Sequence, residues 1–285
     1  MDQRIINLFD EYTHKPLSRK EFMEQLVRLA GGTALAAAAL AVLEPGYAAA
    51  ATVAPDADDL VSEEVTWIGD GAAVRGYLVH PKGRQKRGAV VVIHENRGLT
   101  PHIKDVTRRV AQAGYLALGV DALSVFGGTP TDEDEGRKLI GQLDPAKNLN
   151  NYLRALDYLR ARPDANGRTG CVGFCWGGAM ANRLAVADPK LNAAVSYYGT
   201  QPPAEDVPKI KAALMLHYAG LDERVNAGLA AYEAALKANN IKFEQYVYEG
   251  VNHAFNNDSS PARYNAEAAK LAWERTLRLF KEKLG

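Results

Sequence analysis

A cysteine in a glycine-rich turn is the first residue of this sequence whose setting suggests chemistry. Residues 170–178 read GCVGFCWGG, and they lead from strand-forming residues through a Gly-x-Cys-x-Gly turn into an alanine-rich segment that favours a helix. A strand–turn–helix of this kind lifts its central side chain clear of a sheet, as in a nucleophile elbow. Glycines at 173 and 177 let the strand and helix backbones approach closely. The pattern also fits a packed cysteine, so Cys175 alone does not decide between catalysis and packing.

Three more polar side chains stand shortly after predicted strands. Glu95, Asp222 and His253 each follow an apolar run rich in β-branched or aromatic residues. Because the carboxyl ends of parallel strands meet at one edge of a sheet, we expect these side chains to gather beside Cys175. The chain order nucleophile, acid, histidine is that of α/β-hydrolases. The sequence therefore predicts a catalytic set of Cys175, Asp222 and His253, with Glu95 nearby.

Each of these residues has an alternative structural role. Asp222 could cap the helix that follows it, a common position for Asp, and this role is compatible with catalysis. His253 could be a packed core histidine, although its neighbours Gly250 and Asn252 favour a loop. Glu95 could simply pair with Arg97.

Other histidines and the second cysteine are predicted to be structural. His94 and His217 end buried strands and are expected to be core histidines, and Cys171 is expected to pack in the core. His94 and Glu95 form no zinc motif, because no second histidine follows at helical spacing. The chain has two cysteines, which cannot complete a structural zinc site and lie too far apart on a strand to bridge. No metal or organic cofactor is required by these residues.

The elements that must position these residues alternate along the chain. Turn residues at 69–71 predict a hairpin, and the Gly- and acid-rich stretch 124–135 is predicted to be a surface loop. Strands are expected at 64–68, 74–80, 89–94, 115–120, 169–174, 193–198, 213–218 and 243–248, and helices at 103–113, 145–162, 178–187, 226–238 and 263–283. This alternation predicts an α/β fold: a doubly wound, mostly parallel sheet with helices on both faces.

Composition narrows the class of protein. The 285 residues are 47% apolar and 24% charged, with a formal net charge of zero, so no field favours nucleic acid or an acidic membrane surface. One α/β domain is predicted at 61–285, after an Ala-, Asp- and Pro-rich linker at 52–60. The oligomeric state is not predicted.

Residues 1–51 differ from the rest and are interpreted as a leader. The sequence SRKEFM at 18–23 is followed by an apolar run at 29–43 and by YAAAA at 47–51. A basic pair, an apolar stretch too short for stable membrane insertion and a small-residue site are typical of an export signal, here similar to a twin-arginine signal with one lysine. A working signal implies a periplasmic or exported protein. The alternative is an uncleaved amphipathic N-terminal helix docked on a cytoplasmic protein.

With these residues in view, the chain over about 65–283 resembles the dienelactone hydrolase family of α/β-hydrolases, the carboxymethylenebutenolidase-like enzymes. The matching motifs are HENRGL at 94–99, GFCWGG at 173–178, YYG at 197–199, Asp222 and GVNHAF at 250–255. The resemblance implies that Cys175 is the nucleophile, His253 the base and acid, and Asp222 the group that orients it. It also implies an oxyanion hole from the backbone N–H groups of Trp176 and Asn96, with Glu95 in contact with the thiol.

The sequence departs from this family where two arginines hold a substrate carboxylate. Asn257 occupies one of these places, and Glu133 lies near the other, with Arg137 one helical turn on. The candidate substrate-binding residues are therefore Arg97, Arg137 and Asn257, with Arg224 as a further source of charge. The resemblance implies cleavage of a small carboxylic ester or lactone without specifying dienelactone. The alternatives are a non-catalytic binding protein on this scaffold and a hydrolase of thioester or amide bonds.

Overall fold

An eight-stranded sheet organises the described part of the chain. The computed structural model describes residues 1–15, 17–44, 46, 47 and 51–285. The strands are β1 (Leu60–Ile68), β2 (Ala73–Pro81), β3 (Arg87–Ile93), β4 (Leu116–Asp121), β5 (Ala165–Phe174), β6 (Ala193–Tyr197), β7 (Ala213–Ala219) and β8 (Phe243–Tyr248). Their order is β1-β2-β4-β3-β5-β6-β7-β8, and β2 is antiparallel to both β1 and β4 while all other neighbours are parallel. The predicted hairpin and mostly parallel sheet are confirmed.

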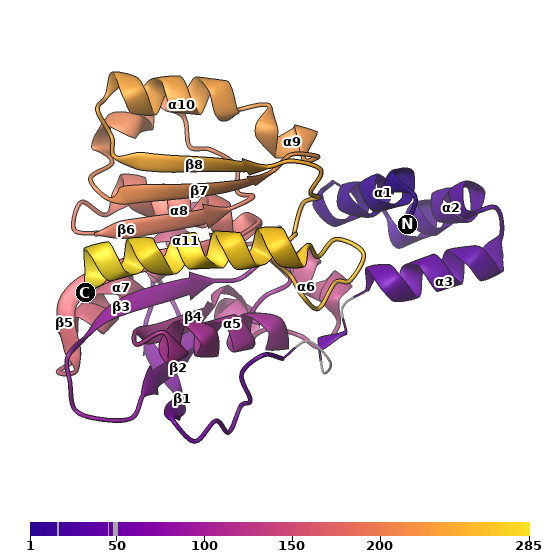
Figure 1. Cartoon of the computed structure of the whole chain (residues 1–285). Coiled ribbons are helices and arrows are strands. Elements are labelled where there is room, and N and C mark those ends of the chain that lie inside the picture. The colour runs from indigo at the N-terminus through magenta and orange to yellow at the C-terminus, as the bar shows by residue number, and fades with distance from the viewer. Residues whose placement is uncertain (16, 45, 48–50) are drawn as a thin grey trace.

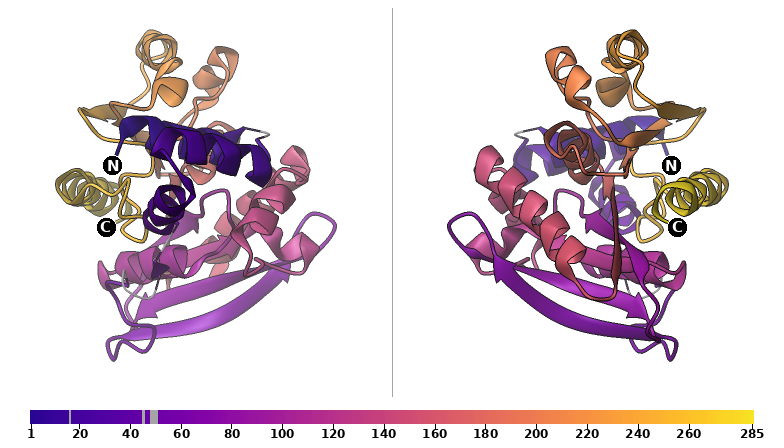
Figure 2. Two further views of the ribbon diagram at one scale, coloured as in Figure 1. Left: turned by 90° about the vertical axis from the view of Figure 1, so that its right-hand side faces the viewer. Right: turned by 90° about the vertical axis from the view of Figure 1, so that its left-hand side faces the viewer.

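Helices cover both faces of this sheet (Figures 1 and 2). The helices of the domain are α5 (Pro101–Gln112), α6 (Glu133–Ile140), α7 (Pro145–Ala161), α8 (Trp176–Ala187), α9 (Glu223–Asn226), α10 (Leu229–Ala238) and α11 (Ala266–Leu284). Helices α5 and α11 share one apolar cluster with the sheet, and α7, α8 and α10 share the cluster on the opposite face. The central strands β3, β4 and β5 carry continuous apolar runs because both of their faces are covered.

One loop prediction and the start of one predicted helix are wrong. The stretch 124–135, predicted as a surface loop, contains the end of a 3₁₀ helix, η1 (Ala122–Phe126), and the start of α6. Both helices begin after an aspartate that caps their first N–H groups. Asp121 accepts a hydrogen bond from Leu123 N–H at the start of η1, and Asp132 accepts from the N–H groups of two first-turn residues of α6. The helix predicted at 226–238 begins later, as α10 at Leu229 after Gly228, and the separate short helix α9 ends at Asn226.

The predicted linker at 52–60 is packed on the domain. Val53 is buried, and its backbone N–H donates to Asp105 at 2.8 Å, as does that of Thr52 at 3.1 Å. Strand β1 already begins at Leu60, four residues before the predicted start. These contacts make the segment a fixed edge of the domain.

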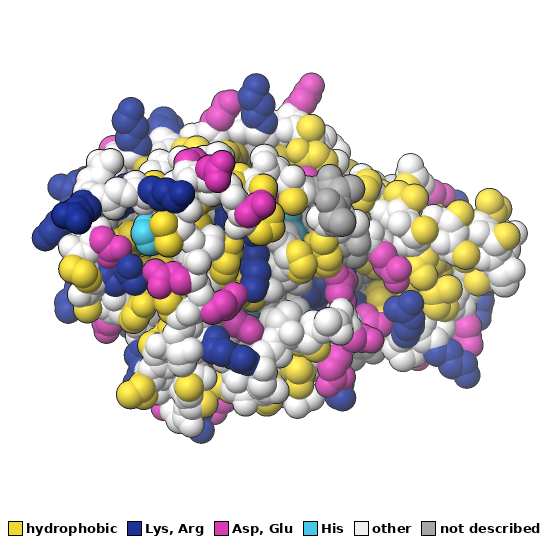
Figure 3. All heavy atoms as spheres, turned by 90° about the horizontal axis from the view of Figure 1, so that it is seen from below, with side chains coloured by type: hydrophobic (Ala, Val, Ile, Leu, Met, Phe, Trp, Pro, Cys, Tyr) yellow, Lys and Arg dark blue, Asp and Glu magenta, His cyan; other side chains and the backbone are white. Residues whose placement is uncertain are grey.

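The described residues before this segment include the helices α1 (Gln3–His14), α2 (Arg19–Ala30) and α3 (Thr33–Leu43). They pack on each other around their own apolar cluster, which contains Phe9, Phe22 and Leu26. Helix α2 begins with a capping box between Ser18 and Glu21. The group projects from the side toward which the strands point, and apolar side chains lie on its surface (Figures 1 and 3).

Among the described residues, no single helix is long and apolar enough to cross a membrane. Helices α2 and α3 reach the required length together, but the chain bends by 113° between them. Residues 48–50, in the small-residue end of the predicted leader, lie outside the described residues.

Candidate active site

Cys175 occupies a strained turn between β5 and α8. Its φ of 56° and ψ of −113° fall outside the helical and extended regions, a conformation that costs a non-glycine residue roughly 1–3 kcal/mol. The turn is held by a hydrogen bond from Cys175 N–H to the Tyr197 carbonyl at 3.0 Å. A Cβ on Gly173 would lie 1.9 Å from the Gly177 carbonyl oxygen, so this close approach requires glycine. The predicted elbow is therefore present, and strain at such a position is a mark of a functional site.

Asp222 and His253 meet beyond the ends of β7 and β8. The His253 Nδ1 lies 2.5 Å from Asp222 Oδ2, with both side chains buried. Asp222 Oδ1 also accepts the Val225 N–H at 3.2 Å, so this residue both caps α9 and orients the histidine. Burial raises the pKa of Asp222, but the hydrogen bond and positive field of His253 outweigh it and lower the pKa. The carboxylate stays charged, and it fixes the Nδ1 proton of the imidazole.

The partner of the thiol is a histidine that the sequence analysis missed. His14, the last residue of α1, places its Nε2 3.0 Å from Cys175 Sγ. Its Nδ1 donates to the Asp10 carbonyl at 2.8 Å and lies 3.2 Å from Asp10 Oδ1. Burial lowers the pKa of His14, but the adjacent Cys175 sulfur and Asp10 raise it further than burial lowers it. His14 Nε2 is thus the hydrogen-bonding partner of the Cys175 thiol.

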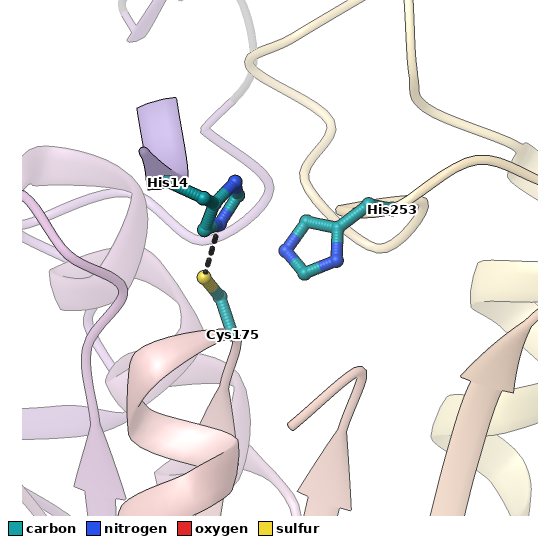
Figure 4. A group of neighbouring side chains, drawn as sticks. All are labelled: His14, Cys175 and His253. Atoms are coloured by element: carbon teal, nitrogen blue, oxygen red, sulfur yellow. Dashed lines mark hydrogen bonds between the residues drawn. The ribbon is translucent and has the colours of Figure 1, made fainter. Parts of the chain in front are cut away.

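His253 faces this pair from the other side (Figure 4). Cys175, His14 and His253 each offer one ring-nitrogen or sulfur atom, and these atoms lie within 4.8 Å of one another. The His253 Nε2 is buried and has no hydrogen-bond partner among the described residues. It is therefore available to a proton or to a bound molecule.

Glu95 lies behind the thiol and is held by Asn257. The Asn257 amide donates to Glu95 Oε2 at 2.9 Å, and its own Oδ1 accepts from Ser259. Asn257 is thus engaged within the protein, which corrects its prediction as a substrate-binding residue. Sγ is hydrogen-bonded to His14, and neither carboxylate oxygen of Glu95 has a hydrogen bond to Sγ among the described residues, which corrects the expected contact of Glu95 with the thiol.

Positive groups keep Glu95 ionised. Burial raises the pKa of this carboxyl, but His102, Arg263 and Arg97 lower it further, so the net pKa is lowered. No ion pair joins Glu95 to Arg97 among the described contacts, because Arg97 pairs with Glu133 at 3.2 Å. Arg263 is buried and lies over the Phe9 ring, 5.0 Å from its centroid.

An open pocket of about 720 Å³ lies over the nucleophile. Its wall includes Cys175, Asn96, Trp176 and His253 from the domain, together with residues 12–15 and 17 from the N-terminal segment. Trp176 is the first residue of α8, so its N–H belongs to the first turn, which has no intrahelical acceptor. Such an N–H beside the nucleophile suits an oxyanion.

The N-terminal segment reaches the pocket through polar contacts with the domain. Asn96 Nδ2 donates to the Thr13 carbonyl at 2.7 Å, and Tyr12 donates to Asp134 Oδ2 at 2.7 Å. Arg137 stacks over the Tyr12 ring at 4.1 Å and donates to the Tyr12 carbonyl at 3.3 Å. Arg137 therefore lines the pocket but is engaged by the N-terminal segment.

The predicted substrate-binding arginine Arg97 lines a second pocket, of about 1030 Å³, that also includes its partner Glu133. Arg97 is buried, and Cys175 does not line this second pocket among the described residues. The structure thus does not bring Arg97 and Arg137 together as a carboxylate clamp over Cys175.

The residues predicted to be structural are confirmed in that role. His217 is buried between Tyr248 and Thr276, which bond its two ring nitrogens, and burial lowers its pKa to about 3. His94 bonds the Glu95 carbonyl and the Ala122 N–H, and burial lowers its pKa. Cys171 is fully buried, and burial raises its pKa.

The parallel sheet, the strained elbow and the buried histidine–aspartate pair at the strand ends define an α/β-hydrolase. The model of the dienelactone hydrolase family matches residues 74–284, and the chain belongs to that family. It is therefore a hydrolase by membership.

Curated relatives extend over most of the chain. A protein of Escherichia coli O157:H7 named "Putative carboxymethylenebutenolidase" is 32% identical over 252 residues, covering 82% of this chain and 92% of the relative. A protein of the same name from Saccharolobus solfataricus is 30% identical over 253 residues, covering 75% and 96%.

Solved structures agree with this assignment. The dienelactone hydrolase-like promiscuous phosphotriesterase P91, from metagenomic libraries, superposes with a TM-score of 0.71 at 25% identity, covering 80% of this chain and all of that one. The dienelactone hydrolase of Anabaena variabilis shares the fold, with a TM-score of 0.61 at 22% identity over 80% of this chain and all of that one.

Proposed function

We propose that this hydrolase cleaves a small carboxylic ester or lactone through a Cys175–His253–Asp222 triad and an acyl-cysteine intermediate. The observation that carries the proposal is the strained Cys175 turn, which faces a histidine oriented by a buried aspartate. The name of the curated relatives, carboxymethylenebutenolidase, supports an ester or lactone bond as the target.

In the first half of the reaction the Cys175 sulfur attacks the carbonyl carbon. The carbonyl oxygen gains the negative charge, and the N–H groups of Trp176 and Asn96 hold it, each such donor contributing about 3 kcal/mol to the transition state. His253, whose ring nitrogen lies within 4.8 Å of both Sγ and His14, takes up the thiol proton at Nε2 in this step. It then gives this proton to the leaving oxygen as the C–O bond breaks, which leaves an acyl thioester on Cys175.

In the second half water completes the cycle. His253 Nε2 takes a proton from the water, and the resulting hydroxide attacks the thioester carbonyl. The C–S bond breaks, the carboxylic acid leaves, and the sulfur recovers its proton. Asp222 stabilises the imidazolium in both halves, because its buried carboxylate accepts a hydrogen bond from Nδ1–H, with 2.5 Å between nitrogen and oxygen.

The surroundings of the pocket favour a substrate without a strong negative charge. Asn257 occupies one place of the family's carboxylate-binding arginines, and its side chain holds Glu95. Arg137 and Arg97 are paired with Asp134 and Glu133 of the protein itself. A neutral ester or lactone, with a leaving group that departs readily as an enol or phenol, fits this arrangement best.

Replacement of each cysteine in turn tests the proposal. We expect Cys175→Ala to lower kcat/KM for an aryl ester by roughly 10⁴-fold or more, because the nucleophile is lost. Cys171→Ala is the matched control, since Cys171 is buried in the core and removed from the pocket lining, and it should retain activity. Hydrolysis by the Cys175→Ala variant at the wild-type rate would exclude an acyl-cysteine. Trapping of a thioester on Cys175 by mass spectrometry provides a direct readout.

A further inference from the structure

Three side chains of types that can bind a metal ion lie together at the turn that carries Cys175. His14 comes from the end of α1, Cys175 from the turn before α8, and His253 from the loop after β8 (Figure 4). Their donor atoms lie within 4.8 Å of one another, and the His14 Nε2 to Cys175 Sγ distance is 3.0 Å. Two imidazoles and one thiolate form a donor set that Zn²⁺ prefers and that Mg²⁺ and Ca²⁺ do not.

The Nδ1 atoms of both histidines face oxygen acceptors, as is usual for histidines that bind a metal through Nε2. The Nδ1 of His14 donates to the Asp10 carbonyl and lies 3.2 Å from Asp10 Oδ1, and the Nδ1 of His253 lies 2.5 Å from Asp222 Oδ2. Because Nδ1 carries the hydrogen in each ring, Nε2 offers its lone pair when the ring is neutral. An outer carboxylate of this kind fixes the ring and strengthens it as a ligand.

One of the donor atoms has no hydrogen-bond partner in the described part of the chain. The His253 Nε2 is buried and has no hydrogen-bond partner among the described residues, and the His253 side chain is 4% exposed. A buried polar atom without a partner is uncommon, and it points to a group that binds there. The pocket beside it gives an ion a path from solvent.

We propose that His14, Cys175 and His253 bind a divalent ion of the zinc class. The ion displaces the thiol proton of Cys175, and this proton passes to the buffer. Three protein ligands leave the fourth position of a tetrahedral ion for water or an anion. A bound ion engages the sulfur and the base nitrogen, so it blocks attack on a carbonyl and fastens α1 to the domain.

This site goes beyond the hydrolase activity, because it needs only the three donor atoms. Metal-free full-length protein should bind one Zn²⁺ per chain in a calorimetric titration, with release of protons. With Co²⁺ as the probe, a thiolate-to-cobalt absorption band should appear. His14→Ala should weaken Zn²⁺ binding by roughly 100-fold or more, since loss of an outer partner alone costs 10–100-fold. His80→Ala, at a partly buried histidine of β2, is the matched control and should bind as wild type does.

The results separate this proposal from the hydrolase mechanism. Absence of stoichiometric Zn²⁺ binding to the wild type would overturn the site, as would undiminished binding to His14→Ala. His14→Gln, which keeps the size of the side chain, repeats the test if His14→Ala loosens α1; protease resistance of α1 itself reports whether the helix remains docked. A protein that binds Zn²⁺ at these residues but hydrolyses no ester would refute the triad and leave the metal site standing.

Discussion

Asp222→Asn is the sharpest test of the triad, because one carboxylate serves two groups. Its Oδ2 lies 2.5 Å from the His253 Nδ1, and its Oδ1 accepts the Val225 N–H at 3.2 Å. Asparagine has only one oxygen. If that oxygen caps α9, the amide N–H₂ faces Nδ1, which must then accept a hydrogen, and the proton moves to Nε2. The base nitrogen is then blocked.

The expected magnitude follows from this conflict. A histidine in the wrong tautomer lowers kcat by about 10⁴-fold in a serine-protease triad, which corresponds to about 5 kcal/mol in the barrier. Asparagine is as good an N-cap as aspartate, so the free energy of unfolding should change by less than about 1 kcal/mol. Activity and stability should therefore separate in this variant.

The assay compares kcat/KM for an aryl ester with the urea unfolding curve of the same sample. Asp144→Asn is the matched control, because Asp144 caps α7 through two first-turn N–H groups on the exposed surface. It should keep full activity. An Asp222→Asn variant within tenfold of the wild type would refute the reasoning, since the carboxylate would then not orient the base.

Three further predictions concern the scaffold. Gly173→Ala should lower the free energy of unfolding by about 3 kcal/mol or more in thermal unfolding, because its Cβ would lie 1.9 Å from a backbone oxygen of α8. The control Gly141→Ala, whose Cβ would lie 3.4 Å from the nearest atom, should change it by less than about 1 kcal/mol. The free energy of unfolding should fall as the pH falls from 6.5 toward 3. In this range His217 binds a proton in the unfolded chain but stays neutral in the folded protein, where its pKa is about 3. His217→Gln should flatten this pH dependence, measured by urea titrations at several pH values. Asn257→Ala should destabilise the chain by roughly 2 kcal/mol in urea, because buried Glu95 loses the donor to its Oε2; an unchanged midpoint would contradict this.

Much of the domain was predictable because its signals are local. The β-branched run of β3 and the glycines around Cys175 leave few other conformations open to those segments. Asp222 and His253 could be predicted because each follows a predicted strand and because their order after Cys175 is the order of an α/β-hydrolase triad. The start of α6 was missed because glycine and acidic residues indicate a loop, while the Asp132 side chain that caps the helix stood within that same pattern.

The role of His14 could not be predicted from the sequence in this way. Its contact with Cys175 joins residues 161 apart, and it depends on how α1 docks on the domain. A signal was nevertheless present: apolar residues Ile5, Leu8, Phe9 and Tyr12 recur at helical spacing and are buried in the structure. The same residues lie in the segment 1–51, whose basic pair and apolar run are also typical of an export signal.

The docked segment has a consequence for how this family is compared. The family match begins at residue 74, but the pocket wall includes residues 12–15 and 17. A prediction of substrate selectivity that considers only the shared domain therefore leaves out one wall of the pocket over Cys175. A protein shortened to the family domain should present a wider, more permissive opening than the full chain. Substitutions in residues 12–15 and 17 are then a route to new substrate ranges that leaves the catalytic domain untouched.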